Sequence, residues 1–466
     1  MKTRPRKYLF RLLMIAAAVL PLSSTLPGRA CAATLRYDLG KCLEMALERH
    51  PKIQIEHFET VRSEALRKAA RSRFLPRLGL EYSYLHRDKI NSYDINNYSF
   101  PANTNDSFQL DIAVVQPLFT GFSLLENYRL AELGLKESRT RQELARLQLI
   151  YETTSAYFAY LKQLRFAATA ARSVARLEAQ AHDAKLFYDS NLIPLNELLY
   201  SKVKLSQARQ RRRRIETRVK LARSRLALLM QLDRDREFTV VDHPVLEKIG
   251  FTLARASAVA RTRRPELRLA NYAVSSAGHR IKLAQSEFYP AVSLKIAHSR
   301  MGDRWDVGGD GITSTPHNTY IGVNARWQIW EWGRRREMVN SARAEEEKAR
   351  QALKEAADKI SLEVKENFEN ALTSYRNIET AKEELELSRE NYRVTKLRFQ
   401  NQLATATDLL DAQAALTQAE AAYDNAVYDY NIQLAALARA AGVEKWTQIT
   451  TATTSPVSEK RTSADR

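Results

Sequence analysis

The residues of this chain that could carry out chemistry are few and scattered. Its 466 residues include eight histidines and two cysteines, and they contain neither a His-Glu-x-x-His nor a Gly-x-Ser-x-Gly motif. Those motifs supply the metal ligands and the nucleophile of common hydrolases. His50 and His57 are seven positions apart, which fits surface positions better than a metal pair. The sequence therefore predicts no enzyme, no cofactor and no metal site.

Three carboxylates are spaced so that they could concentrate negative charge in one place. Asp408 and Asp411 are three positions apart, so both side chains would lie on one face of a helix. Glu197 begins a Glu-Leu-Leu sequence that corresponds to the Asp-Leu-Leu at residue 408. Acidic residues at helix starts also serve as caps or promote solubility. Their role therefore depends on the architecture around them.

The chain contains one unit twice. Matching segments lie 211 to 214 positions apart, which indicates a duplication rather than chance composition. Each copy alone could neither close a sheet nor bury its helices, so the fold must combine the copies. The matching segments are His50-Pro51 with Arg264-Pro265, Phe74-Leu75-Pro76 with Phe288-Tyr289-Pro290, the segment from Gln116 to Gly121 with that from Gln328 to Gly333, and Glu197-Leu198-Leu199 with Asp408-Leu409-Leu410.

Residues 1–32 have the pattern of a secretory signal peptide. Basic residues precede an apolar run from Leu12 to Leu22, and Ala30-Cys31-Ala32 provides a cleavage site. Lipidation at Cys31 is the weaker alternative, because an arginine just before the small residue makes a poor lipobox. Cleavage would leave Cys42 as the single cysteine, so no intrachain disulfide is expected.

Export limits what the positive charge can mean. Removal of residues 1–32 takes the formal net charge from +19 to +13. The densest basic cluster, Arg209 with residues 211–214, lies in a long helical pattern, and we interpret it as a solvated helix face. Nucleic acid is not expected as a partner of an exported protein. No later segment has the ~18 consecutive apolar residues of a membrane-spanning helix.

Two segments, at about residues 77–118 and about 291–331, alternate with the period of β-strand hairpins. Leu78, Leu80 and Tyr82, for example, alternate with small or charged residues. Each strand is ~10–12 residues long, enough to cross hydrocarbon when tilted. Aromatic residues gather near the strand ends, as they do at lipid–water boundaries. A half-buried sheet in a soluble domain would show the same pattern, but the signal peptide favours membrane strands.

Four strands cannot close a membrane-spanning barrel, since roughly eight is the practical minimum. An open edge in lipid would leave backbone groups without hydrogen-bond partners, at a cost of several kcal/mol each. Several chains must therefore share one barrel. Three chains with twelve strands is the natural small number, although strand counting alone also admits two.

A long helical hairpin follows each strand hairpin, at about residues 122–232 and about 334–441. No proline interrupts the first arm of either one, so each arm could reach about 100 Å at 1.5 Å per residue. Apolar residues recur every seven positions, as in helices that pack on one another. An ordinary antiparallel coiled coil is the alternative to a tube. The predicted domains are a signal peptide, 1–32; a first repeat, 33–250; a second repeat, 251–446; and a polar, disordered tail, 447–466.

The chain resembles the TolC-like outer-membrane efflux protein family over about residues 35–445. The resemblance rests on the prolines before the strands, on the glycines after them, and most specifically on the segment from Arg398 to Gln413. It implies a mainly α fold with membrane β: a trimeric 12-stranded β-barrel, four strands per chain, continuous with a long periplasmic α-helical barrel. It also implies a homotrimer in outer-membrane lipid that docks onto a periplasmic adaptor (membrane fusion) protein and an inner-membrane pump.

The same resemblance gives the three carboxylates a role. Family members carry an acidic pair at the closed periplasmic end, and Asp408 and Asp411 match it. Three copies would form stacked acidic rings that favour cations. Glu197 matches an acidic position that helps to hold the tip shut. The arginine expected after the second turn is Ala404 here, so the closing bonds should differ.

Both helical hairpins are expected to turn at an asparagine. Asparagine tolerates the left-handed conformation that ends a helix, and Asn191 and Asn401 replace the loop glycine of the family. The turns should lie at the end of the tube far from the strands, where the resemblance implies contact with the adaptor. The expected docking residues are Asn191, Leu192, Ile193, Asn401, Gln402 and Leu403.

The sequence thus predicts the outer-membrane exit duct of a tripartite exporter, passively conducting substrates from a periplasmic pump complex to the exterior. Small-molecule efflux and type I protein secretion would use the same duct, and the sequence does not separate them. The alternative is a periplasmic coiled-coil structural or adaptor protein without a pore.

Overall fold

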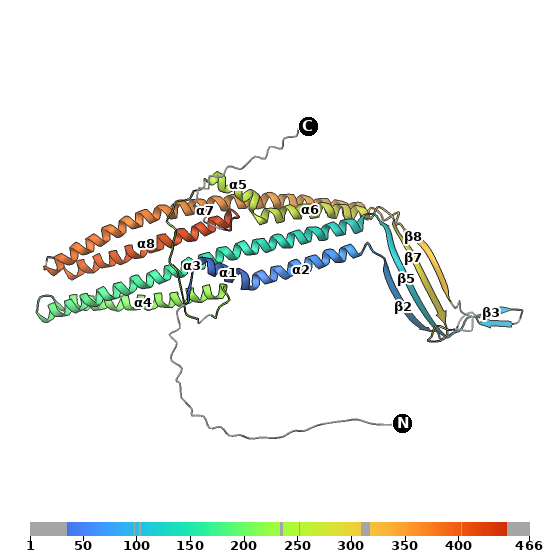
Figure 1. Ribbon diagram of the computed structural model, residues 1–466, viewed down its shortest axis with the longest axis horizontal. Helices are drawn as coiled ribbons and strands as arrows, with labels where there is room; N and C mark the ends of the chain where they lie inside the picture. Colours follow the sequence, from blue (N-terminus) through green and yellow to red (C-terminus); the bar gives the residue numbers. More distant parts are fainter. Residues whose placement is uncertain are drawn as a thin grey trace, which may run out of the picture.

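The computed structural model describes residues 35–96, 98–101, 104–233, 236–250, 252–308, 317–401 and 403–444. The predicted signal peptide, with Cys31, and the predicted tail lie outside the described residues. The described residues form an elongated layer of helices that joins a sheet of four strands at one end (Figure 1).

Two helices of 67 residues, α3 and α7, run the length of the helical layer. At 1.5 Å per residue, each is about 100 Å long. The layer has the order α2-α3-α6-α7 near the strands and α4-α3-α8-α7 at the far end. None of the described helices is both long and apolar enough to cross a membrane. The bounds are α1 (Leu39–Arg49), α2 (Pro51–Ser72), α3 (Ser123–Asp189), α4 (Leu195–Leu229), α5 (Leu253–Arg263), α6 (Pro265–Ser286), α7 (Arg334–Gln400) and α8 (Ala406–Ala440).

The predicted seven-residue stripe forms the contact between α7 and α8. Leu385, for example, is buried against Leu416 and Ala419 of α8. Such regular packing fixes the register of two antiparallel helices along their length, and the prediction of long paired helices is confirmed. Successive apolar contacts along the pair join Ala371 with Leu437, Leu385 with Leu416, and Phe399 with Leu409.

Four antiparallel strands form one open sheet in the order β2-β5-β7-β8. One face is polar, with Glu81 opposite Asp111, and the other is apolar. The apolar face is bare in one subunit, since Leu78 is 74% and Ile321 is 69% exposed. In the described chain, the outer edges of β2 and β8 have no strand partner. The strands are β2 (Arg77–His86), β5 (Asp106–Thr120), β7 (Ala291–Gly302) and β8 (Asn318–Arg326).

Two parts of the sheet differ from the prediction. The second hairpin ends at Arg326 rather than near residue 331. Trp327 Nε1 donates to the carbonyl of Phe288 (3.1 Å), and Arg335 donates to the carbonyl of Gln328, so this segment is held at the junction with the helices. An unpredicted small hairpin, β3 (Ser92–Ile95) and β4 (Tyr98–Pro101), extends the loop of the first hairpin (Figure 1).

The described chain starts with a short strand that periodicity did not predict. β1 (Leu35–Tyr37) pairs in parallel with β6 (Phe238–Val240), which follows the first helical hairpin. The helix begins only after Asp38, whose side chain accepts a hydrogen bond from the N–H of Lys41 as an N-cap. The two ends of the first repeat are thereby joined.

The segment after β6 crosses α3 and α8. Asp242 accepts a hydrogen bond from the hydroxyl of Tyr428 (2.8 Å) and pairs with Arg165 of α3. Asn431 of α8 accepts from the N–H of Val245 (2.9 Å) and donates to its carbonyl (3.1 Å). This segment therefore fastens the first helical hairpin to the second near the middle of the layer.

The junctions between strands and long helices require left-handed backbone. Gly121 and Phe122 precede α3 with φ of +62° and +71°, and Trp332 and Gly333 precede α7 with φ of +50° and +86°. A Cβ at Gly121 would lie 2.3 Å from the carbonyl oxygen of Ser286, whereas one at Gly333 would meet nothing within 4 Å. Both glycines allow the left-handed backbone, but only Gly121 also allows the close approach of the chain to Ser286 of α6.

We expect Gly121→Ala to reduce thermal stability far more than Gly333→Ala. The left-handed backbone costs an alanine about 1–2 kcal/mol at either position, but only the first substitution also forces α6 away from the junction. Thermal unfolding of the detergent-solubilised protein, followed by helical circular dichroism, measures both. Equal losses would contradict a role for the close approach at Gly121.

Candidate gate at the tips of the helical hairpins

The turn between α3 and α4 closes with paired backbone hydrogen bonds. Asn191 is left-handed, with φ of +59°. Its N–H donates to the carbonyl of Tyr188 (2.9 Å), and the N–H of Leu192 donates to that of Phe187 (2.8 Å). This is a Schellman motif, which satisfies carbonyls left free at a helix end. The prediction of a left-handed asparagine is confirmed at this position.

The same prediction is wrong for Asn401, whose φ is −94°. The N–H of Leu403 donates to the carbonyl five residues earlier (2.7 Å), the bond that Leu192 makes in the first turn. Leu403 therefore corresponds to Leu192, and Asn191 corresponds to Gln402, which lies outside the described residues. The prediction had paired the two asparagines one position out of register.

At the start of α8, the carboxylate of Asp408 caps the helix. It accepts hydrogen bonds from the N–H (2.9 Å) and the hydroxyl (2.8 Å) of Thr405, whose hydroxyl accepts from the N–H of Asp408 (3.1 Å). This reciprocal arrangement is a capping box. The bonds from Thr405, with a smaller effect of the Arg398 charge, lower the pKa of Asp408. Helix capping thus accounts for Asp408, and the residue stays ionised at neutral pH.

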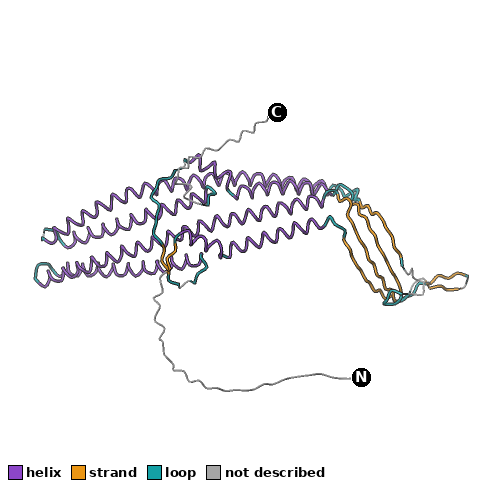
Figure 2. The backbone as a smooth tube through the Cα atoms, viewed as in Figure 1, coloured by secondary structure: helices purple, strands orange, loops and turns teal. Residues whose placement is uncertain are grey.

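Asp411 and Glu197 are not engaged in this way. Asp411 lies one turn further along α8 and is exposed, and Glu197 lies partly exposed in the first turn of α4. Among the described residues, no hydrogen bond or ion pair joins the three carboxylates to one another. The turns that precede α4 and α8 lie at the end of the layer far from the strands (Figure 2), and the three carboxylates lie in the first two turns of these helices. The described part of the chain contains no cluster of side chains suited to a metal ion.

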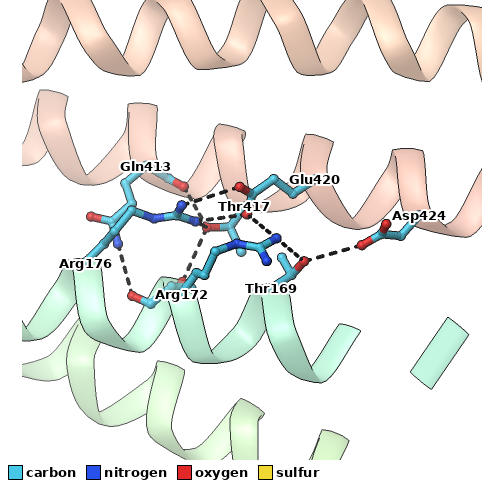
Figure 3. A network of polar contacts seen from close by, with 8 residues as sticks. Thr169, Arg172, Arg176, Gln413, Thr417, Glu420 and Asp424 are labelled. Atoms are coloured by element: carbon cyan, nitrogen blue, oxygen red, sulfur yellow. Dashed lines mark hydrogen bonds and ion pairs between the residues drawn. The ribbon is translucent and has the colours of Figure 1, made fainter. Parts of the chain in front are cut away.

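Behind the tips, a polar network joins the two helical hairpins (Figure 3). Arg176 of α3 pairs with Glu420 of α8 at 3.1 Å, and their side chains are 20% and 10% exposed. The same guanidinium donates to the hydroxyl of Thr417 (3.2 Å), which donates to the hydroxyl of Ser173 (3.3 Å). Charge-assisted bonds of this kind are stronger than neutral ones. The network therefore holds α3 against α8.

The network continues along α8 to Asp424. The hydroxyl of Thr169 donates to Asp424 (3.4 Å), while Arg172 donates to Thr169 (2.9 Å) and lies 3.7 Å from Glu420. Burial raises the pKa of Asp424, and the charges of Arg165 and Arg172 oppose this shift. Two carboxylates of α8 are thus held along a row of arginines on α3.

This network was not predicted from the sequence. The available signal was a pair of arginines four positions apart, Arg172 and Arg176, and a matching pair of carboxylates, Glu420 and Asp424. Residues four apart share a helix face, and charges within an alanine-rich packing face need partners.

Comparison with protein-family models finds a match in both repeats. Residues 42–232 and 257–443 match the family described as "Outer membrane efflux protein". Among curated proteins, Protein CyaE of Bordetella pertussis is 28% identical over 208 residues, which are 45% of this chain and 41% of that protein. The chain therefore matches less than half the length of this relative.

Solved structures of outer membrane proteins share this fold over most of the chain. The CmeC outer membrane channel of Campylobacter jejuni is 17% identical, with a TM-score of 0.75 over 87% of this chain and 85% of that chain. The outer membrane protein VceC of Vibrio cholerae is also 17% identical, with a TM-score of 0.74 over 87% of this chain and 96% of that chain. The MtrE outer membrane channel of Neisseria gonorrhoeae, solved in its open state, is 18% identical, with a TM-score of 0.70 over 87% of this chain and 89% of that chain.

These likenesses confirm the predicted fold class, a mainly α chain that contributes four strands to a membrane barrel. The family match agrees with the predicted location in the outer membrane, with a periplasmic helical extension, and with a chain that is not an enzyme. Because the matched segments cover both repeats and most of the chain, this protein belongs to the outer membrane efflux protein family.

Proposed function

We propose that this protein is the exit duct of a tripartite exporter, formed by three copies of the chain. The open sheet carries the proposal: four strands with one bare apolar face continue into helices of 67 residues. In lipid, unpaired strand edges cost several kcal/mol for each backbone group, so β2 and β8 need other copies. Twelve strands from three copies close a barrel, and the helical layers extend it into the periplasm.

The polar face of the sheet would line the duct. A groove of about 790 Å³ follows this face, and Glu81, Asp111 and Lys295 are among the residues that line it. The side-chain amide of Gln109 donates to Asp111 at 2.6 Å. A wall with charges of both signs suits passive conduction of hydrated substrates. The energy for transport would then come from an inner-membrane pump, and small molecules and proteins are both possible substrate classes.

Exposed apolar residues at the turns support docking to a periplasmic adaptor protein. Leu192 is 56% exposed and Leu403 is 69% exposed, each on a turn closed by backbone hydrogen bonds. Three copies would gather six of these leucines at one end of the duct, and apolar patches of this kind mark interaction surfaces. Asn191, Ile193 and Asn401 would add neighbouring contacts.

Of the three carboxylates, Asp411 fits a ring of charge at the closed end best. Its side chain is exposed, and no described residue bonds to it, whereas Asp408 is held by Thr405. Three copies of Asp411 would favour cations at a constriction. Asp408 would contribute its charge to the same field, and Glu197 would add charge from the other hairpin.

Conductance tests the proposal as a whole. Purified protein added to a planar bilayer should produce discrete conductance steps, and the native protein should fractionate with the outer membrane. A periplasmic coiled-coil protein without a pore would instead appear in the soluble periplasmic fraction and give no steps. That outcome would overturn the proposal.

Neutralising the proposed ring should weaken block by polyvalent cations. With Asp411→Asn, the concentration of hexaamminecobalt(III) that halves the single-channel current should rise several-fold, because fewer negative charges face the ion. Asp408→Asn should have a smaller effect. Glu355→Gln, an exposed change on α7 far from the tips, serves as the control. Unchanged block in the Asp411 variant would remove this residue from the gate.

The link between the hairpins should restrain opening of the tips. Glu420→Ala leaves Arg176 without its counter-ion, a loss that costs about 3–5 kcal/mol at full burial and less here, where Arg176 is 20% exposed. We expect a lower melting temperature and more frequent opening in the bilayer.

The matched control for this change is Glu178→Ala. It breaks the half-exposed pair of Glu178 with Arg209 (2.7 Å) on the same hairpin. Such a pair contributes about 0–1 kcal/mol. Equal effects of the two substitutions on melting and opening would contradict a restraining role of Glu420.

A further inference from the structure

A groove of about 610 Å³ lies where the helical layer meets the sheet, at the end of α6 (Figure 1). The turn before α3 lines it with Phe122, α6 contributes Lys282, and α7 contributes Arg336 and Arg343. Because α6 packs against both α3 and α7, the groove lies within the width of the layer rather than at an edge. Contacts with other copies at the edges of the layer therefore leave this groove free.

Three aromatic rings connect the groove to the apolar face of the sheet. The ring centre of Tyr289 lies 6.1 Å from that of Phe122, and both rings lie next to Phe119 of β5, at 6.4 and 5.4 Å. Phe119 is opposite Val292 of β7, and Val292 lies on the same face of the sheet as the exposed Ile321. The groove therefore opens beside the surface that the proposed duct presents to lipid.

Three basic side chains of the groove have no counter-ion in the described subunit. Lys282, Arg336 and Arg343 are exposed, and no described residue forms a hydrogen bond or an ion pair with any of them. They come from two neighbouring helices, α6 and α7. The groove can therefore offer three free positive charges to a ligand.

Carboxylates near these cations have other partners. Glu126, which also lines the groove, is buried and lies 2.7 Å from Arg129 and 2.6 Å from Nδ1 of His279. The other carboxylates with partners are Glu287 with Arg334, Glu331 with Arg335, and Glu337 with the amide of Asn340. The groove therefore carries an excess of positive charge.

The groove lies at the level of lipid headgroups when the sheet crosses the membrane. β5 ends at Thr120 and β7 begins at Ala291, beside the aromatic rings. Arg336 and Arg343 are two and nine residues from the start of α7, which is about 3 and 14 Å along the helix. Side chains of α7 point back toward its start, and long basic side chains extend their charge toward a polar boundary. Because the headgroup region is about 5–8 Å thick, these cations can reach lipid phosphate.

We infer that this groove binds the headgroup of a phospholipid with net negative charge, from the membrane leaflet that faces the periplasm. The inference rests on the proposed function, which places the sheet in the outer membrane. Guanidinium groups bind phosphate with two parallel hydrogen bonds, and basic pockets of membrane proteins suit acidic headgroups. The rings of Phe122 and Tyr289 would pack on the glycerol and the first acyl carbons. A zwitterionic headgroup would instead bring its own ammonium group against three cations.

Lipid retention by the purified complex tests this site. The protein in detergent receives equal amounts of phosphatidylglycerol and phosphatidylcholine, and native mass spectrometry counts the lipids that stay bound. We expect up to three phosphatidylglycerol molecules per complex of three chains and little phosphatidylcholine. Combining Lys282→Gln, Arg336→Gln and Arg343→Gln should weaken phosphatidylglycerol binding about 100-fold, because each cation near an anionic surface contributes about fivefold.

The matched control removes the same number of positive charges far from the groove. It combines Lys365→Gln, Lys382→Gln and Arg389→Gln, which are exposed positions on α7, about 46 Å or more from its start. This variant should retain phosphatidylglycerol as the unaltered protein does. An equal loss in the control would show that binding follows net charge alone, and would overturn the site.

Ionic strength provides a test on the unaltered chain. Salt screens exposed charges, so raising ammonium acetate from about 0.05 M to about 0.5 M should remove most of the preference for phosphatidylglycerol. An unchanged preference would contradict recognition by the three cations.

The remaining outcomes separate the site from the duct. Millimolar glycerol 3-phosphate should not displace phosphatidylglycerol, because it lacks acyl chains; full displacement would mean that the groove takes a soluble anion, and would overturn the lipid site. Equal retention of the two lipids by a complex of three chains would reject the site and leave the proposed duct intact. A monomer that stays soluble without detergent would reject the duct itself, and the site with it.

Discussion

The unpaired edges of a four-stranded sheet constrain the rest of this molecule. The outer strands β2 and β8 have no strand partner within the described subunit, and the apolar face between them is exposed. A bilayer accommodates that face, but it offers no hydrogen bonds to the edges. The edges must therefore meet other copies of the chain. This requirement places the polar face inside a shared barrel and brings the attached helices together as one wall.

The helical layer transmits this constraint to the far end of the molecule. α3 and α7 start just after the left-handed junctions at Gly121 and Gly333, so closing the barrel also positions two continuous helices of 67 residues. The Arg176–Glu420 network fixes neighbouring hairpins within a subunit. Contacts between subunits then decide whether the wall closes. The exposed carboxylates at the tips lie beyond these restraints, where a gate would act.

Much of this architecture follows from sequence periodicity, because burial on one face imposes a period of two on strands and of seven on paired helices. Contacts between segments that are far apart in the sequence cannot be predicted from this periodicity. The three-residue strands β1 and β6 are too short to show a period. Gln116 and Gln328 occupy matching positions in the two repeats, as do Phe74 and Phe288. The side-chain amide of Gln116 donates a hydrogen bond to the carbonyl of Phe74, but the carbonyl of Phe288 accepts its hydrogen bond from Trp327 instead of Gln328. For Asp408, spacing predicted the helix face correctly, yet Thr405 holds its carboxylate as a cap.

The most direct test of this account is the number of copies in the purified, signal-cleaved protein, measured by native mass spectrometry from detergent micelles. The account predicts a complex of three chains that loses solubility when detergent is removed, because three sheets of four strands would close one barrel with no unpaired edge and an apolar outer face. A single chain that stays dispersed in buffer without detergent would show that the edges and the apolar face need no partners, and would contradict the account.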